Sequence, residues 1–324
     1  FALSCKTPML MDSFMHDRYK IPALVYNYKK PKELISILKD MDDNKFKNLH
    51  EKVINFSEQL LKKNRTICSP FVKGSFTFTE IKNRTGQVKW KGNIPQSLFQ
   101  THERRTVPKN MAKEMKSVME SAPGASYTFY DAEERRKYIE AHYPSAIKPY
   151  DSLLPGAYKC DIFRYIRLYV EGGVYLDSPY SVSPKRTMFG DIINKNDDFV
   201  AAWDIRERKS KAVFYGFIAS IPKHPILHEL IETALRHVRQ QDYLDTALSI
   251  TGAVMMGRVM KRNNASTKKG VWLLDHEDNV ISDEKGMILY TRYPEYVTDR
   301  FVLENGMPHY GNLWDSEDVY KKAA

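Results

Sequence analysis

One stretch, residues 158–177, constrains the fold of this chain more than any other part of the sequence. Apolar residues at helical spacing predict a helix with one buried face, formed by Ile162, Tyr165, Ile166 and Tyr169. Gly172 and Gly173 predict the end of that helix, because glycine readily adopts the positive φ of such a turn. Residues 174–176 then predict a short buried strand that ends on Asp177.

Three charged residues in this stretch are candidates for a binding site. Asp161 and Arg164 lie three residues apart, which makes them neighbours on a helix surface. Asp177 follows the strand, and open α/β sheets bind ligands at the carboxyl ends of their strands. Taken alone, an Asp and Arg pair on a helix is more often a solvated ion pair of little energetic weight. The whole pattern is more specific than the pair.

The stretch resembles the signature A-x-x-x-D-x-x-R-Y-x-x-L-x-x-x-G-G-x-Y-x-D-x-D of sugar-nucleotide glycosyltransferases of family 32 type, related to the clostridial glucosylating toxins. The matching residues are Asp161, Arg164, Tyr165, Leu168, Gly172, Gly173, Tyr175 and Asp177. The resemblance implies that Asp161 and Arg164 hold the donor sugar and that Asp177 holds a divalent metal, Mn²⁺ or Mg²⁺, on the diphosphate. The second carboxylate of D-x-D is replaced by Pro179, so we expect a weakened metal site.

Residues 94–101 resemble the strand I-P-K-x-I-H-Q-T that opens the catalytic domain of the same family. In that family the end of this strand meets the nucleotide. The resemblance therefore implies that Ser97, Phe99, Gln100 and Thr101 line the pocket for the base and ribose. Phe99 stands where the family more often has His.

Two later segments extend the predicted donor site. Residues 214–225 resemble N-G-F-I-A-S-x-x-x-H-P, with Tyr215 in the place of the usual Asn. Thr251 opens a helix that resembles the T-G-P-x of the family, and we expect it near the donor. Capping of that helix would explain Thr251 equally well.

Two further residues complete the set of candidates. Asp204 ends a predicted strand over residues 198–204 and is a candidate catalytic residue that contacts the acceptor or the sugar. His309 opens a segment that resembles H-x-x-G-x-W, and in related transferases a C-terminal His completes the metal shell. A single His is otherwise more often structural.

The resemblance covers residues 94–314 and implies a GT-A fold, a Rossmann-like α/β domain with a mostly parallel central sheet flanked by helices. We assign this catalytic domain to residues 91–324 and a helical N-terminal extension to residues 1–90. Within the extension, residues 44–63 predict a helix with one apolar stripe, formed by Phe46, Leu49, Val53, Phe56 and Leu60. The stripe packs on the catalytic domain or, alternatively, forms a weak self-associating coil.

Charge and composition limit the partners. Lys and Arg number 50 against 40 Asp and Glu, a net charge of +10 that suits anionic ligands. We expect no nucleic-acid partner, because no recognised binding module or dense basic run accompanies this charge. The three cysteines are odd in number and have no C-x-x-C spacing, so they indicate neither a zinc site nor a disulfide framework.

Several features concern the compartment. Sequons at Asn55, Asn64, Asn83 and Asn264 weakly favour a secretory compartment such as the Golgi lumen. A cytosolic or viral origin stays open. The chain starts with Phe, as a chain trimmed of a signal or anchor would, and no apolar run approaches the roughly 20 residues that span a bilayer.

These features predict a retaining glycosyltransferase that moves a hexose from a UDP- or GDP-sugar to a hydroxyl of a glycan, protein or lipid. Such a reaction needs no strong enzymic base if the leaving phosphate takes the acceptor proton. The alternative is an inactive relative that binds a nucleotide sugar or a glycan, which Pro179 and Tyr215 favour.

Overall fold

The computed structural model describes residues 77–321, except 88, 205–211, 266–267, 278, 294–295, 297–298 and 300–308. Thr77–Ala324 forms one compact unit, which includes the described residues before Lys91. The predicted helix at 44–63, its apolar stripe and its self-association lie outside the described residues. The division of the chain into an extension and a catalytic domain stays a prediction.

A nine-stranded sheet dominates the described part of the chain. The strands follow the order β4 (Ser126–Tyr130), β2 (Ser97–Thr101), β5 (Gly173–Leu176), β8 (Val213–Ser220), β7 (Phe199–Trp203), β9 (Val271–Glu277), β10 (Val280–Asp283), β11 (Gly286–Tyr290) and β6 (Ser181–Val182). A small second sheet pairs β1 (Phe78–Glu80) with β3 (Thr106–Pro108).

The sheet is mixed in direction. β4, β2 and β5 run parallel, as expected, and so do β7 and β9. β8 runs antiparallel between β5 and β7, and β9, β10, β11 and β6 pair antiparallel. Because β8 is antiparallel to both of its neighbours, the carboxyl ends of β2, β4, β5 and β7 all lie at one edge.

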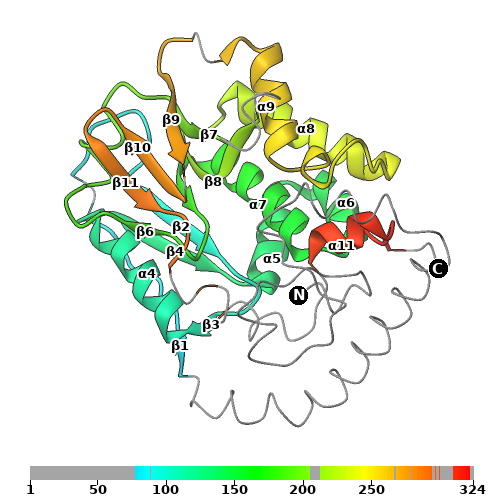
Figure 1. Ribbon diagram of the computed structural model, residues 1–324, viewed down its shortest axis with the longest axis horizontal. Helices are drawn as coiled ribbons and strands as arrows, with labels where there is room; N and C mark the ends of the chain where they lie inside the picture. Colours follow the sequence, from blue (N-terminus) through cyan, green and yellow to red (C-terminus); the bar gives the residue numbers. More distant parts are fainter. Residues whose placement is uncertain are drawn as a thin grey trace, which may run out of the picture. The chain divides into compact units, whose positions relative to one another are not determined.

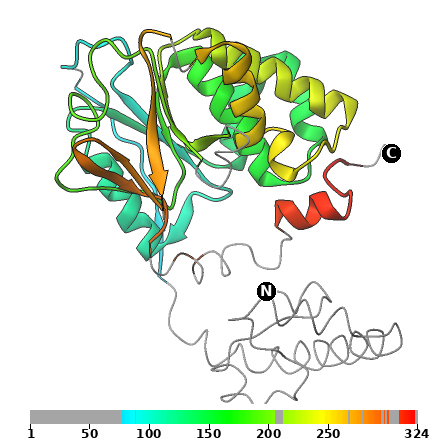
Figure 2. The same cartoon turned by 45° about the horizontal axis from the view of Figure 1, so that its top comes forward.

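Helices cover both faces of this sheet (Figures 1 and 2). The face opposite α4 (Lys109–Glu120) carries α5 (Ala132–His142), α6 (Ile147–Ser152), α7 (Gly156–Glu171), α8 (Pro225–Gln240) and α9 (Ala253–Arg262). Short elements η2 (Pro144–Ala146), η4 (Ala247–Ser249) and α11 (Tyr310–Asp315) complete this set. The α/β class that the GT-A resemblance implies is confirmed. No helix in the described part is long and apolar enough to cross a membrane.

Alternation along the strands divides the interior into two cores. Phe99 and Tyr175 pack toward α7 and α8, whereas Leu98 and Val174 pack toward α4. Successive side chains of a strand point to opposite faces, so each central strand contributes to both cores.

The predicted helix, glycine turn and strand are confirmed. α7 ends at Glu171, and Gly172 and Gly173 have φ values of 66° and 96°. A Cβ at Gly173 would lie 2.2 Å from the Ser97 Oγ atom, so the turn requires glycine for space as well as for conformation. The strand that follows is β5, which ends beside Asp177.

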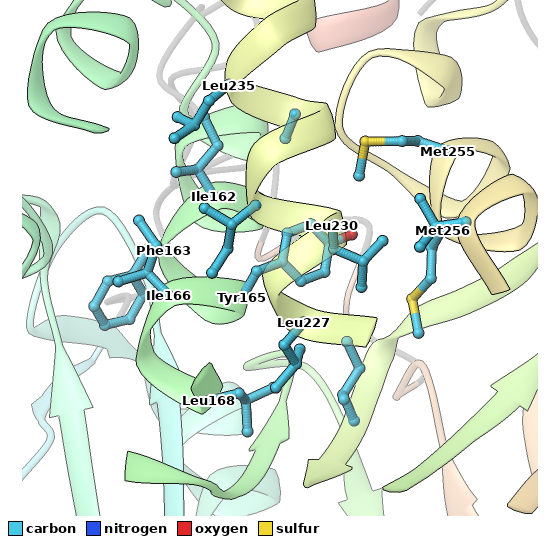
Figure 3. Close-up of a cluster of buried hydrophobic side chains, with 14 of the residues drawn as sticks. Ile162, Phe163, Tyr165, Ile166, Leu168, Leu227, Leu230, Leu235, Met255 and Met256 are labelled. Atoms are coloured by element: carbon cyan, nitrogen blue, oxygen red, sulfur yellow. The ribbon is translucent and has the colours of Figure 1, made fainter. Parts of the chain in front are cut away.

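α7 and α8 pack on each other in the core, and Ile162, Tyr165, Ile166, Leu227 and Leu230 belong to one buried cluster (Figure 3). These side chains are fully or almost fully buried. This packing holds α7 in place over the sheet. It therefore determines where Asp161 and Arg164 of α7 lie relative to the carboxyl ends of the strands.

Truncation of this contact should be costly. We expect Leu230→Ala to lower the free energy of unfolding by about 2–5 kcal/mol, because the vacated volume is fully enclosed. Urea unfolding measures this loss. Leu154→Ala is the matched control, since Leu154 is 43% exposed and should change the free energy by less than about 0.5 kcal/mol. Equal losses in the two variants would contradict this account of the core.

Candidate functional site

Asp161 and Arg164 are not a solvated surface pair, because they are only 2% and 4% exposed. The Nη2 atom of Arg164 lies 3.0 Å from Oδ1 of Asp161. Its Nη1 atom lies 3.3 Å from Oδ1 of Asp177 and donates to the carbonyl oxygen of Tyr215 at 2.8 Å. The structure thus brings the three predicted charged residues together, with Arg164 between the two carboxylates.

Thr251 holds the carboxylate oxygen of Asp161 that does not face Arg164. The Thr251 hydroxyl donates to Oδ2 of Asp161 at 2.7 Å. Oδ1 of Asp161 is buried and faces Arg164 in an ion pair whose geometry is not that of a hydrogen bond. Burial raises the pKa of Asp161 to about 7, although the charge of Arg164 and the bond from Thr251 oppose the rise.

Asp177 is held by two tyrosines. Its Oδ1 accepts a hydrogen bond from the Tyr175 hydroxyl at 2.5 Å, and its Oδ2 accepts one from the Tyr180 hydroxyl at 3.1 Å. Gly216 lies directly behind, where a Cβ would come within 2.8 Å of Oδ2. The side chain of Asp177 remains 31% exposed, so a ligand can reach it.

Gln100 and Thr101 lie at the same edge of the sheet, where they hydrogen-bond to the turn at Asp177 and Ser178. Gln100 is fully buried, accepts from the Tyr127 hydroxyl at 3.0 Å and donates to the backbone oxygen of Asp177 at 3.1 Å. The Ser178 hydroxyl donates to the backbone oxygen of Thr101 at 2.6 Å. These bonds fix the turn that carries Asp177.

The structure does not bring Ser97 and Phe99 to this edge. Ser97 is the first residue of β2 and lies against Gly173, at the opposite end of the strand. Phe99 is fully buried against Phe163, Tyr130 and Tyr175. Its side chain points to the face of the sheet that α7 and α8 cover and is fully buried there, so the expected base and ribose contacts of these two residues are not supported.

Thr251 and Tyr215 both lie in the site. Thr251 is fully buried and precedes Gly252, the N-cap of α9, so its hydroxyl binds Asp161 instead of capping the helix. The ring of Tyr215 lies against the Arg164 guanidinium, with 4.8 Å between the guanidinium carbon and the ring centroid.

Asp204 and His309 lie farther out. Asp204 follows β7 on the same side of the sheet as Asp177, but the Asp204 amide bonds to Ala212 whereas the Asp177 amide bonds to Gly216, so Asp204 lies four residues farther along β8. His309 is the N-cap of α11, where its Nδ1 accepts from the Gly311 amide at 3.2 Å. Its ring packs on Tyr310, and Tyr310 packs on Tyr158 of α7, which places His309 near the first turn of α7.

The residues present suit a divalent cation only in part. Both lone pairs of Oδ1 on Asp177 face Tyr175 and Arg164, so Oδ2 offers the free position. Pro179 has no ligand atom. Among the described residues no group of three or more His, Cys, Asp or Glu side chains gathers in a form that could hold a metal ion. A cation would fit here with Asp177 as a ligand and the donor phosphates as most of its shell.

Sequence reasoning missed Tyr180 and Gly216. Tyr180 lies in the turn that starts at Asp177, whose backbone oxygen accepts from the Tyr180 amide at 3.2 Å. The spacing of three residues within Asp-Ser-Pro-Tyr indicates such a turn, but a hydroxyl aimed back at the carboxylate has no signal in the sequence. Gly216 belongs to the motif at residues 214–225, but the motif does not indicate that this glycine lies against Asp177.

Comparison with known proteins agrees with this geometry. Residues 108–199 match the family described as "Glycosyltransferase sugar-binding region containing DXD motif". Residues 108–199 are thus similar to the sugar-binding region of these glycosyltransferases. The matched range contains Asp161, Arg164 and Asp177, and the resemblance seen in the sequence is therefore confirmed.

Individual proteins are similar to parts of this chain. Inositol phosphoceramide mannosyltransferase 3 of Schizosaccharomyces pombe is 32% identical over 84 residues, 26% of this chain and 24% of the relative. An uncharacterized glycosyltransferase of Acanthamoeba polyphaga mimivirus is 24% identical over 200 residues, 59% of this chain and 74% of the relative. The solved PaToxG glycosyltransferase has a TM-score of 0.41 and 14% identity, covering 55% of this chain and 71% of that one. The match to the yeast relative spans about a quarter of its length.

The raised pKa of Asp161 predicts a specific pH dependence of stability. Between about 4, the usual pKa of Asp, and the native value of about 7, only the unfolded state is ionised. Unfolding then releases a proton, so the stability of the wild type falls as pH rises through this window. Asp161→Asn lacks this loss, and its melting temperature relative to the wild type should rise from about pH 4 to about pH 7.

A control variant tests this assignment. Hydrogen bonds from Arg258 and Ser249 lower the pKa of Asp245 to about 2. The melting temperature of Asp245→Asn relative to the wild type should therefore stay constant above about pH 5. A constant difference for Asp161→Asn as well would show that the carboxyl of Asp161 is not perturbed.

Proposed function

We propose that this protein is a retaining glycosyltransferase that moves a hexose from a nucleoside-diphosphate sugar to a hydroxyl acceptor. The observation that carries the proposal is the buried ion pair of Asp161 and Arg164 beside the partly exposed Asp177, at the carboxyl edge of β5 within the family match. The family and its named relatives supply the reaction class.

The buried pair is suited to hold the sugar. Four of the five N–H groups of Arg164 face the Cys160 carbonyl, the Tyr215 carbonyl and the two carboxylates. The Oδ1 atom of Asp161 is buried and has no hydrogen-bond partner among the described residues, so we propose that it and the Nη2 atom of Arg164 bond to hydroxyls of the donor sugar. Such charge-assisted bonds in a fixed geometry orient the anomeric carbon for attack.

In the transfer step the bond between the anomeric carbon and the diphosphate oxygen breaks, and the acceptor oxygen forms a bond on the same face. The acceptor proton passes to the departing diphosphate, so no enzymic base is required. Arg164 contributes positive charge near the departing group. Asp204, at the same sheet edge, is our candidate for contact with the acceptor or the sugar.

Asp177 and His309 are the residues that we propose to hold Mn²⁺ or Mg²⁺. A divalent cation there would stabilise the negative charge that develops on the diphosphate. Because the protein offers few ligands, the cation should bind together with the donor.

The donor and acceptor classes follow from the relatives and the charge. The yeast relative is a mannosyltransferase whose named acceptor is inositol phosphoceramide, so a GDP- or UDP-hexose and a lipid, glycan or protein hydroxyl are proposed here. A net charge of +10 favours an anionic acceptor. Asn83 and Asn264 are exposed, which is compatible with the proposed secretory compartment.

A second candidate function is an inactive relative that binds nucleotide sugar. Pro179 and the two tyrosine hydroxyls on Asp177 favour it, because they leave little of that carboxylate for a cation. Turnover separates the two functions: hydrolysis or transfer of any donor in a panel of GDP- and UDP-sugars with Mn²⁺ excludes the inactive relative.

Removal of Arg164 should affect transfer more than folding. We expect Arg164→Ala to lower kcat/KM about 100-fold or more, because the sugar and diphosphate lose a preorganised cation. Arg186→Ala is the matched control: Arg186 is also buried and also pairs with two carboxylates, Asp191 and Asp283. If both variants lose activity only in proportion to their loss of melting temperature, Arg164 is structural.

Removal of the Asp177 charge should abolish the coupling between metal binding and donor binding. Asp177→Asn keeps the shape but loses the charge, so Mn²⁺-stimulated turnover should disappear while the fold is retained. Calorimetric titration of Mn²⁺ with and without sugar nucleotide measures the coupling. Asp299→Asn is the control, because Asp299 also accepts from a tyrosine hydroxyl, that of Tyr293 at 2.8 Å. Donor binding without metal and unchanged turnover in Asp177→Asn would contradict the metal role.

A further inference from the structure

The guanidinium of Arg164 contacts two aromatic rings. Its central carbon is 4.4 Å from the centroid of Tyr175 and 4.8 Å from the centroid of Tyr215. The two tyrosines come from different strands, β5 and β8. Tyr175 also donates to Asp177, whereas the Tyr215 backbone accepts from Arg164. Tyr215 therefore contacts Arg164 through both its ring and its carbonyl.

Tyr215 is itself held by the start of α9. It packs on the small cluster of Ala212, Ala253 and Val254. A Cβ on Gly252 would lie 3.4 Å from the Cζ atom of Tyr215, so the backbone at Gly252 comes close to the ring. Thr251, one residue earlier, binds Asp161. The residues at the start of α9 thus contact Asp161 directly, through Thr251, and Arg164 indirectly, through Tyr215.

The geometry points to Tyr215 as a positioning residue whose ring fixes the Arg164 guanidinium for the donor. The ion pair of Arg164 with Asp161 lacks the geometry of a hydrogen bond, so it does not by itself fix the orientation of the guanidinium. The rings of Tyr215 and Tyr175, both in contact with the guanidinium, restrict its movement. The role belongs to the ring, so phenylalanine should replace tyrosine here. An asparagine, usual in the family at this place, has no ring to supply it.

This inference rests on the proposed donor role of Arg164. The test measures donor affinity by calorimetry and kcat/KM for Tyr215→Phe, Tyr215→Leu, Arg164→Lys and the double variant Tyr215→Leu with Arg164→Lys. We expect Tyr215→Phe to stay within about 2-fold of the wild type, and Tyr215→Leu to lose roughly 5- to 30-fold in kcat/KM, the factor that corresponds to a desolvated cation–π contact. In the Arg164→Lys background Tyr215→Leu should add less than about 2-fold, because the two residues act as one unit.

Tyr169→Leu is the matched control. Tyr169 is also half-buried and carries a cation over its ring, the Lys223 ammonium at 4.4 Å, but it lies at the other end of α7. It should lose stability without a change in kcat/KM.

Each outcome has a separate meaning. Equal losses in Tyr215→Phe and Tyr215→Leu would assign the effect to the hydroxyl and overturn the positioning role. Additive losses in the double variant would overturn it too. If the wild type binds a donor and Tyr215→Leu has the same donor affinity and kcat/KM, this inference is wrong but the proposed function stands. A wild type that binds no sugar nucleotide would remove the proposed function and this inference together.

Discussion

The positive charge of Arg164 is the constraint on which the site depends. A guanidinium that is 4% exposed is costly to bury unless it is paired and hydrogen-bonded. The compensating groups come from three elements: Asp161 on α7, Asp177 after β5 and the Tyr215 carbonyl on β8. These elements must meet at one point for the charge to be tolerated. The same condition brings two carboxylates and a cation to the carboxyl edge of the sheet.

Such a network is weak evidence for stability. Buried ion pairs are often matched or exceeded by well-packed apolar side chains, because desolvation offsets the attraction between the charges. The apolar contact between α7 and α8 can hold the helix without any charge at all. Burial also raises the pKa of Asp161 to about 7, and strongly perturbed carboxyl groups gather at functional sites. We therefore attribute the network to ligand binding.

Pro179 stands where the second carboxylate of D-x-D is expected and has no ligand atom in its side chain. Pro179 lies within the turn that connects Asp177 to Tyr180, and both tyrosines donate to the remaining carboxylate. These hydrogen bonds occupy acceptor positions of Asp177 that a cation would otherwise use. A cation at this site consequently depends on the donor phosphates, whereas Arg164 is a permanent positive charge of the protein.

The sequence by itself determined the local elements and the three central residues. The spacing of apolar residues, the two glycines and the strand were sufficient for α7, β5 and the position of Asp177, because helix and strand periods and positive φ are properties of neighbouring residues. Only the tertiary structure decided that β8 runs antiparallel between β5 and β7. It also decided that Phe99 faces α7 and α8 and that Thr251 binds Asp161 instead of capping α9. Each of these depends on which distant surface covers a given face. Contacts between residues about 50 to 90 positions apart leave no periodic trace in the sequence.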